Sequence, residues 1–156
     1  MKRILFLDID GVLAGYEFLK TGKGFIDPAN VALLNELDGV EVVISSSWGY
    51  DNGRTEKSLR GCGLTLPIIG YTEHFYQDWI CRGNEIEKWL HDTFHGMGTK
   101  FGPCYADSHY EYVIVDDDCD MLLGQSENFV RTDRETGITK EDIEKIKTIL
   151  KIKKDE

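Results

Sequence analysis

Two aspartates, Asp8 and Asp10, directly follow a short apolar segment at residues 4–7, and Gly11 comes immediately after them. The apolar segment is typical of a buried strand. A turn after Asp8 would bring the Asp10 side chain toward the same crevice, and Gly11 permits such a turn because it has no Cβ. Two neighbouring carboxylates repel each other unless a cation lies between them. The pattern therefore indicates a site for a hard divalent ion such as Mg²⁺, although Asp-x-Asp-Gly is equally typical of a simple β-turn.

Two later apolar segments also end in residues that can do chemistry. The β-branched segment 40–44 runs into Ser45, Ser46 and Ser47, and the segment 112–115 runs into an acidic cluster from Asp116 to Asp120. A simple β-turn could account for the aspartates after one strand. It does not account for three strands that each end in carboxylates or hydroxyls within one short chain. Carboxylates from two strands would hold a metal ion, and a serine hydroxyl would bind phosphoryl oxygens.

The elements that must position these residues alternate between strands and helices. We expect a helix from Asp27 and Pro28 to Gly39, a helix over 83–94, and a last helix that opens with Thr139 and Asp142 as a capping box. Expected strands cover residues 4–7, 40–44, 66–69, 112–115 and 128–131, and the strand with Pro67 either lies at an edge of the sheet or begins at the proline. Alternation of this kind predicts an α/β fold with a mostly parallel sheet, in which ligands bind beyond the carboxyl ends of the strands.

Arg82 is the candidate cation for binding a phosphoryl group. It stands just before Gly83 and the expected helix 83–94, and a helix N-terminus adds partial positive charge and free N–H groups. The alternative is an ordinary surface arginine, and the sequence leaves both open.

Together these segments resemble the four motifs of the haloacid dehalogenase superfamily, whose members are mostly Mg²⁺-dependent phosphatases. Residues 8–12 resemble motif I, residues 42–47 motif II, Arg82 with Gly83 motif III, and residues 115–120 motif IV, in the family's order. The resemblance implies a Rossmann-like sheet flanked by helices. Residues 46–48 and 82–90 also resemble a branch linked to multidomain RNA-repair proteins.

The resemblance implies a role for each motif residue. Asp8 would be the nucleophile that forms an aspartyl-phosphate, and Asp10 the general acid and base. The implied phosphate-binding residues are Ser46, Ser47 and Arg82, and the implied Mg²⁺ ligands are Asp8, Asp10 through its main-chain carbonyl, Asp116 and Asp117.

Three details of this carry-over stay open. Any of Ser45, Ser46 and Ser47 fits motif II, and either Asp117 or the pair of Asp116 with Asp120 fits motif IV. Arg82 replaces the more usual lysine, which keeps the charge but changes its shape.

Length and composition suit one soluble domain over residues 1–156. The formal net charge of −10 disfavours generic binding to nucleic-acid backbones. The chain has no apolar run of the ~20 residues that a membrane span requires. Its start does not resemble a secretion signal, so we expect a cytoplasmic protein with no membrane partner. Four cysteines without a C-x-x-C pair argue against structural zinc and favour free thiols.

The gaps between motifs are too short for a sizeable cap domain. An open site suits a phosphorylated substrate with bulky flanks, and nucleotides, polynucleotide ends and phosphopeptides all remain candidates. Aromatic residues near the expected rim could stack on a base, although packing is the more ordinary role: Tyr16, Phe18, Trp48, Tyr50, Tyr71, Phe75 and Tyr76.

The leading functional prediction is a Mg²⁺-dependent phosphomonoester hydrolase that acts through an aspartyl-phosphate. A catalytically weak module that holds phosphate ends or a partner is the first alternative. A nucleotidase or polynucleotide-end phosphatase in nucleic-acid repair is a more specific variant, and phosphoryl transfer to an acceptor other than water is another.

Overall fold

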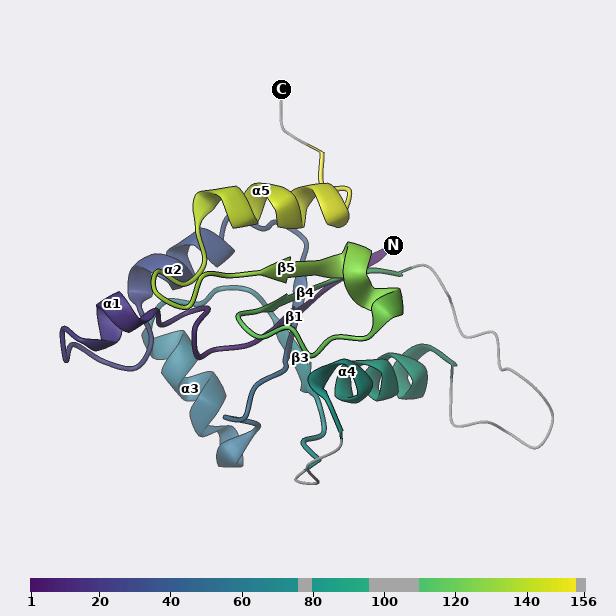
Figure 1. Cartoon of the computed structure of the whole chain (residues 1–156), viewed down its shortest axis with the longest axis horizontal. Helices are drawn as coiled ribbons and strands as arrows, with labels where there is room; N and C mark the ends of the chain where they lie inside the picture. The colour runs from purple at the N-terminus through teal and green to yellow at the C-terminus, as the bar shows by residue number, and fades with distance from the viewer. Residues whose placement is uncertain (76–79, 96–109, 154–156) are drawn as a thin grey trace.

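A five-stranded parallel sheet lies at the centre of the fold. The structure is a computed structural model that describes residues 1–75, 80–95 and 110–153. Every pair of neighbouring strands is parallel, in the order β3-β2-β1-β4-β5 (Figure 1). The strands are β1 (Lys2–Leu7), β2 (Glu41–Ile44), β3 (Ile68–Tyr71), β4 (Tyr110–Asp116) and β5 (Phe129–Arg131). The predicted α/β fold with a Rossmann-like sheet is confirmed.

The direction of strand addition changes at β1. The chain moves outward from β1 through β2 to β3, then returns to place β4 on the other side of β1. Leu7 pairs with Ile44 of β2 and with Val115 of β4. The residues that follow these three positions therefore emerge at one edge of the sheet, where parallel α/β folds bind their ligands.

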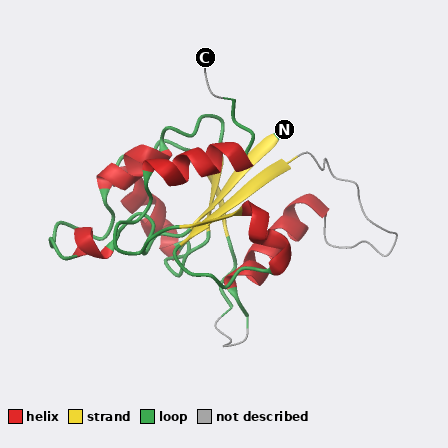
Figure 2. Cartoon of the chain, turned by 45° about the horizontal axis from the view of Figure 1, so that its top comes forward, coloured by secondary structure: helices red, strands yellow, loops and turns green. Residues whose placement is uncertain are grey.

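Two apolar layers cover the sheet, because side chains alternate between its faces. On one face, residues such as Leu5, Val42 and Val113 form a fully buried cluster with side chains of α2 (Pro28–Leu34), α3 (Arg54–Gly61) and α5 (Lys140–Ile149). On the other face, Ile4 and Phe6 pack against α4 (Arg82–Leu90). Figure 2 shows the strands between these helices.

Most predicted elements are confirmed, and their boundaries move by a few residues. The helix predicted to end at Gly39 ends at Leu34 and gives way to turns, in which the Leu37 N–H donates to the Leu34 carbonyl. Strand β3 begins at Ile68 because Pro67 has no N–H, and it lies at the sheet edge as predicted. The capping box of α5 is present, with the Thr139 N–H donating to Asp142 at 3.0 Å.

Helix α4 begins one residue earlier than predicted, at Arg82, and a π-helical turn, His91–His95, follows it. Residues 8–40, between β1 and β2, hold only α1 (Tyr16–Leu19) and α2, so this insertion point carries no cap domain. Most of the loop predicted over 95–111 lies outside the described residues.

None of the described helices is long and apolar enough to span a membrane. Cys62, Cys81 and Cys119 carry free thiols, as predicted, and Cys104 lies outside the described residues.

Candidate active site

Backbone hydrogen bonds fix three strand ends at the same edge of the sheet. The Asp8 N–H donates to the Val115 carbonyl at 3.0 Å, and the Ser45 N–H donates to the Leu7 carbonyl at 2.8 Å. Asp116 is the last residue of β4, and its carbonyl accepts from the Thr132 N–H at 3.0 Å. The sheet itself therefore holds the backbone of Asp8, Ser45 and Asp116.

Asp8, Asp116 and Asp117 bring carboxylate oxygens within 4.8 Å of one another. Asp8 and Asp116 are buried, at 7% and 3% exposure. Burial raises the pKa of Asp8 from 3.8 to about 6, against the lowering effects of a backbone hydrogen bond at Ile9 and the Arg82 charge. Burial, and then the negative charge of Asp8, raise the pKa of Asp116 to about 8. Both carboxylates thus resist ionisation in the absence of a cation.

These carboxylates fit a hard divalent cation such as Mg²⁺. Three oxygen donors converge from two neighbouring strand ends, and a cation among them would offset both the burial and the mutual repulsion. Asp117 joins this group, whereas Asp120, the other motif IV candidate, is exposed and accepts a hydrogen bond from the Arg82 N–H at 2.9 Å.

Gly11 allows the chain to turn sharply after the first aspartate. Its φ is +74°, a left-handed conformation that favours glycine, and a Cβ at this position would clash with the Asp117 side chain. The turn leaves Asp10 exposed, where its carboxylate accepts a hydrogen bond from the Trp48 indole Nε1–H at 3.2 Å. The Asp10 carboxylate therefore lies outside the three-carboxylate group.

The three serines after β2 have different surroundings. Ser46 is buried at 3% exposure, and its hydroxyl acts as a hydrogen-bond donor that lowers the pKa of Asp8. Ser47 is exposed and lines the same pocket as Asp8. The Ser45 hydroxyl is buried and finds no hydrogen-bond partner within the described ranges.

Arg82 reaches the carboxylates from the first turn of α4. Its Nε lies 3.9 Å from Asp116 Oδ2 and its Nη1 lies 3.6 Å from Glu85 Oε2, and its side chain is 15% exposed. Glu85 is also buried, and its other oxygen accepts from the Phe75 N–H at 3.1 Å. The guanidinium thus lies partly buried between two buried carboxylates, whereas an ordinary surface arginine would extend into solvent.

Close backbone packing places the start of α4. A Cβ on Gly83 would lie 2.5 Å from the Leu122 nitrogen and 2.7 Å from Gln125 Oε1. Buried Gln125 joins the two segments, since its amide donates to the Gly83 carbonyl at 2.9 Å and accepts from the Leu122 N–H at 3.0 Å. Only a residue without a side chain fits at position 83, and this close packing determines where the neighbouring Arg82 lies.

A pocket of about 330 Å³ opens over the site. Asp8, Asp10, Ser47, Arg82 and Asp117 line it, so the structure brings together residues from all four predicted motifs.

The pocket also has lining residues that the sequence did not identify. Leu19 of α1 contributes to it, as does Arg134, whose Nη2 lies 3.1 Å from Asp117 Oδ2, and these two lie beside Tyr16, which was among the aromatic residues expected near the rim. No motif marks these residues, and only the folded chain brings the loop after β5 next to β1.

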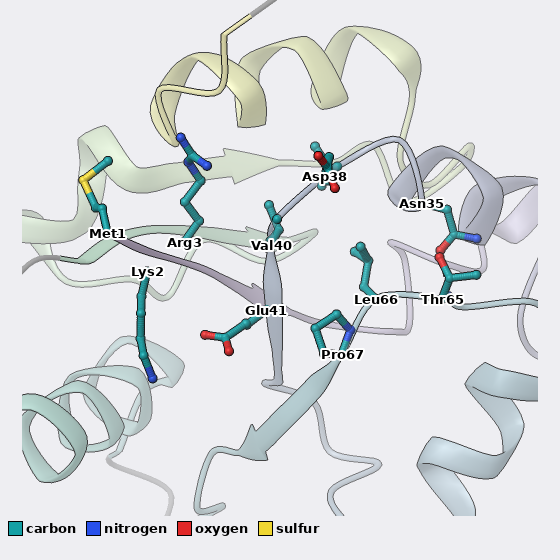
Figure 3. Close-up of a pocket in the computed structure, with 12 residues that line it drawn as sticks. Met1, Lys2, Arg3, Asn35, Asp38, Val40, Glu41, Thr65, Leu66 and Pro67 are labelled. Carbon is teal, nitrogen blue, oxygen red and sulfur yellow. The ribbon is translucent and has the colours of Figure 1, made fainter.

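A separate hollow of about 570 Å³ lies at the opposite edge of the sheet, around the starts of β1 and β2 (Figure 3). Arg3 and Glu41 lie there, and the Arg3 Nε–H donates to the Leu150 carbonyl at 3.0 Å. Because none of the predicted motif residues reaches this edge, we place the candidate active site at the carboxyl ends of the strands.

The aromatic residues expected near the rim include both exposed and packed side chains, and Tyr16 and Tyr50 are exposed at 49% and 59%. Tyr50 and Tyr71 form an edge-to-face pair with ring centroids 5.4 Å apart, and Trp48 packs against the main apolar cluster. Tyr76 lies outside the described residues.

Comparison with known proteins adds one finding to this geometry. No curated protein and no solved structure matches the chain. One family model, described as the HAD domain in Swiss Army Knife RNA repair proteins, matches residues 4–143, a span that contains all four motifs. The chain therefore belongs to this family of haloacid dehalogenase-like domains, within a superfamily of mostly phosphatase-type hydrolases.

Proposed function

We propose that this chain is a Mg²⁺-dependent phosphatase that forms an aspartyl-phosphate at Asp8. One observation carries the proposal: a buried carboxylate at the end of β1 faces two further carboxylates within 4.8 Å, and Arg82 lies 3.9 Å from one of them. A carboxylate can act as a nucleophile toward phosphorus only where positive charge offsets its repulsion by the phosphate.

In the first step, an Asp8 carboxylate oxygen attacks the phosphorus atom of a phosphomonoester. The bond from phosphorus to the leaving oxygen breaks, and the leaving alkoxide takes a proton from Asp10. Arg82 and the hydroxyls of Ser46 and Ser47 bind the other phosphoryl oxygens, where charge accumulates in the transition state.

In the second step, water attacks the phosphorus atom of the aspartyl-phosphate. Asp10, now ionised, accepts a proton from that water, and the bond from phosphorus to the Asp8 oxygen breaks. The hydrogen bond from Trp48 Nε1 at 3.2 Å orients the Asp10 carboxylate at the mouth of the pocket. Asp10 is exposed and lines the pocket, so the attacking water can reach it.

Asp8, Asp116 and Asp117 would hold the metal ion, with the Asp10 main-chain carbonyl as the further ligand implied by the family resemblance. When bound, Mg²⁺ would neutralise negative charge on Asp8 and on the phosphate.

A phosphorylated nucleic-acid end is the substrate class that the family favours, because its domains occur in RNA repair proteins. The insertion point between β1 and β2 carries no cap that would exclude a polymer.

The direct test replaces the nucleophile. We expect Asp8→Asn to lower the rate of phosphomonoester hydrolysis by roughly 1,000-fold or more, because an amide cannot form the phosphoenzyme. Asp38→Asn is the matched control, since Asp38 is exposed and lines the hollow at the opposite edge of the sheet. The measurement is phosphate release from terminally phosphorylated oligonucleotides and from a generic phosphomonoester, with Mg²⁺ and with EDTA.

The same assay separates the alternatives. Unchanged turnover in the Asp8→Asn variant would reject the covalent mechanism. Binding of phosphorylated ends without turnover by the native chain would identify a binding module, and a phosphorylated product other than inorganic phosphate would identify transfer to another acceptor.

A further inference from the structure

An apolar groove of about 470 Å³ lies beside the candidate active site. Phe18 of α1, Phe25 in the loop after α1, and Trp48 after β2 form aromatic parts of its wall, and the start of α2 and one side of α3 complete it. Lys23 contributes a cation at the same groove. In Figure 1, α1, α2 and α3 all lie at the left of the sheet.

Two structural links place this groove next to the catalytic pocket. Helix α1 lies between them, with Phe18 in the groove and Tyr16 and Leu19 in the catalytic pocket. Trp48 lines the groove, and its indole Nε1–H donates to Asp10 at 3.2 Å. A ligand whose phosphate lies at Asp8 can therefore extend past α1 and Trp48 into the groove.

Phe25 presents an unusual amount of apolar surface to water. It is 75% exposed, although phenylalanine is among the residues most often buried. Tyr16 and Tyr50, at 49% and 59% exposure, complete the exposed aromatics within the described residues, and all three lie in segments that follow β1 or β2 at the active-site edge. Phe25 lines the groove and Tyr16 lines the catalytic pocket, and exposed apolar surface beside a pocket is typical of a ligand-binding site.

We propose that this groove binds the nucleobase of the nucleotide that carries the reactive phosphate. The inference rests on the proposed phosphatase function and specifies its substrate class. Phe25, Phe18 and Trp48 offer ring surfaces on which a base can stack, a mode of binding that every base satisfies. Lys23 can pair with a neighbouring phosphate of a nucleic acid. An apolar peptide side chain in the groove would bring no such charge for Lys23 to pair with.

The charge of the whole chain agrees with recognition through a base. A formal net charge of −10 opposes binding through the sugar-phosphate backbone alone, so affinity for a nucleic-acid end must come from local contacts. Stacking in an apolar groove supplies such a contact without requiring a basic surface.

The test compares oligonucleotides with a 3′- or 5′-terminal phosphate whose last residue is either a normal nucleotide or an abasic site. We expect the native chain to have a kcat/KM about tenfold higher for normal ends, the usual size of one base–aromatic stack. Phe25→Ala should remove most of this preference, and Phe25→Trp should retain it. Leu123→Ala, at a residue 92% exposed and outside the groove, is the matched control and should keep the native preference.

A binding measurement separates this inference from the proposed function. Calorimetric titration of the Asp8→Asn variant with the same oligonucleotides and Mg²⁺ should show tighter binding of normal ends than of abasic ends. Adding Phe25→Ala to this variant should remove the difference. Both results are expected even if the native chain shows no hydrolysis. Equal binding of normal and abasic ends would overturn the inference, as would an equal effect of Phe25→Ala on both. Tighter binding of a phosphopeptide than of any normal end would also overturn it.

Discussion

Asp8 and Asp116 are held where their own ionisation is unfavourable. Their pKa values are raised to about 6 and about 8 by burial, and for Asp116 also by the charge of Asp8. The fold therefore retains protons that the unfolded chain releases near pH 4. In metal-free protein this difference makes the free energy of unfolding decrease as the pH rises from about 4 to about 8.

A divalent cation should oppose this pH dependence. Mg²⁺ binds the ionised carboxylates, so we expect it to stabilise the fold more at pH 8 than at pH 5, by at least about 1 kcal/mol. The measurement is urea unfolding at both pH values, with EDTA and with Mg²⁺. In Asp116→Asn the metal-free stability should depend less on pH and the effect of Mg²⁺ should shrink. An undiminished response to Mg²⁺ in that variant would place the ion elsewhere.

At the scale of elements, the position of α4 determines where the Arg82 guanidinium lies. The helix starts against the segment that follows β4, where Gly83 leaves no room for a Cβ beside Leu122 and where Gln125 hydrogen-bonds both segments. Asp120 strengthens the same junction by accepting the Arg82 N–H at 2.9 Å.

Gly83→Ala should therefore impair activity by displacing Arg82, although Arg82 itself is not substituted. The added methyl group forces α4 away from Leu122, and we expect a loss of about 1–3 kcal/mol in the free energy of unfolding together with weaker phosphate binding. Gly124→Ala is the control, because a Cβ there meets nothing within 4 Å. The readouts are urea unfolding and KM for a phosphomonoester, and native values of both for Gly83→Ala would contradict the packing argument.

Local sequence signals were sufficient for most of these elements. The β-branched run before Ser45 and the Thr139–Asp142 capping box predict their elements because the determining contacts are local. The predicted end of α2 at Gly39 was wrong because turns after Leu34 compete with the helix, a choice that residue preferences do not resolve.

At the scale of the whole molecule, the parallel sheet unites sites that are far apart in the sequence. The strand order, which places β4 beside β1, explains why Asp8 and Asp116 meet. The alternating pattern predicted only that the carboxyl ends of the strands would form one ligand-binding edge. Other features of the site depend on how the loops fold over that edge. These features are the position of Asp117 rather than Asp120 beside Asp8, the place of Arg134 in the pocket and the exposure of Phe25. Such long-range contacts leave no periodic signal in the sequence. The single domain over residues 1–156 and the cytoplasmic location stay predictions.

The most direct test of the central claim is the chemical state of Asp8 during turnover. Asp10→Asn should slow hydrolysis of the phosphoenzyme, and p-nitrophenyl phosphate has a leaving group good enough to react without the proton from Asp10. Acid quenching, proteolysis and mass spectrometry of that variant with Mg²⁺ should find one phosphoryl group on the peptide that contains Asp8. The same peptide should be unmodified when Asp8→Asn is added. Release of p-nitrophenol by the Asp10→Asn variant with an unmodified Asp8 peptide, or with the phosphoryl group on another residue, would contradict the proposed mechanism.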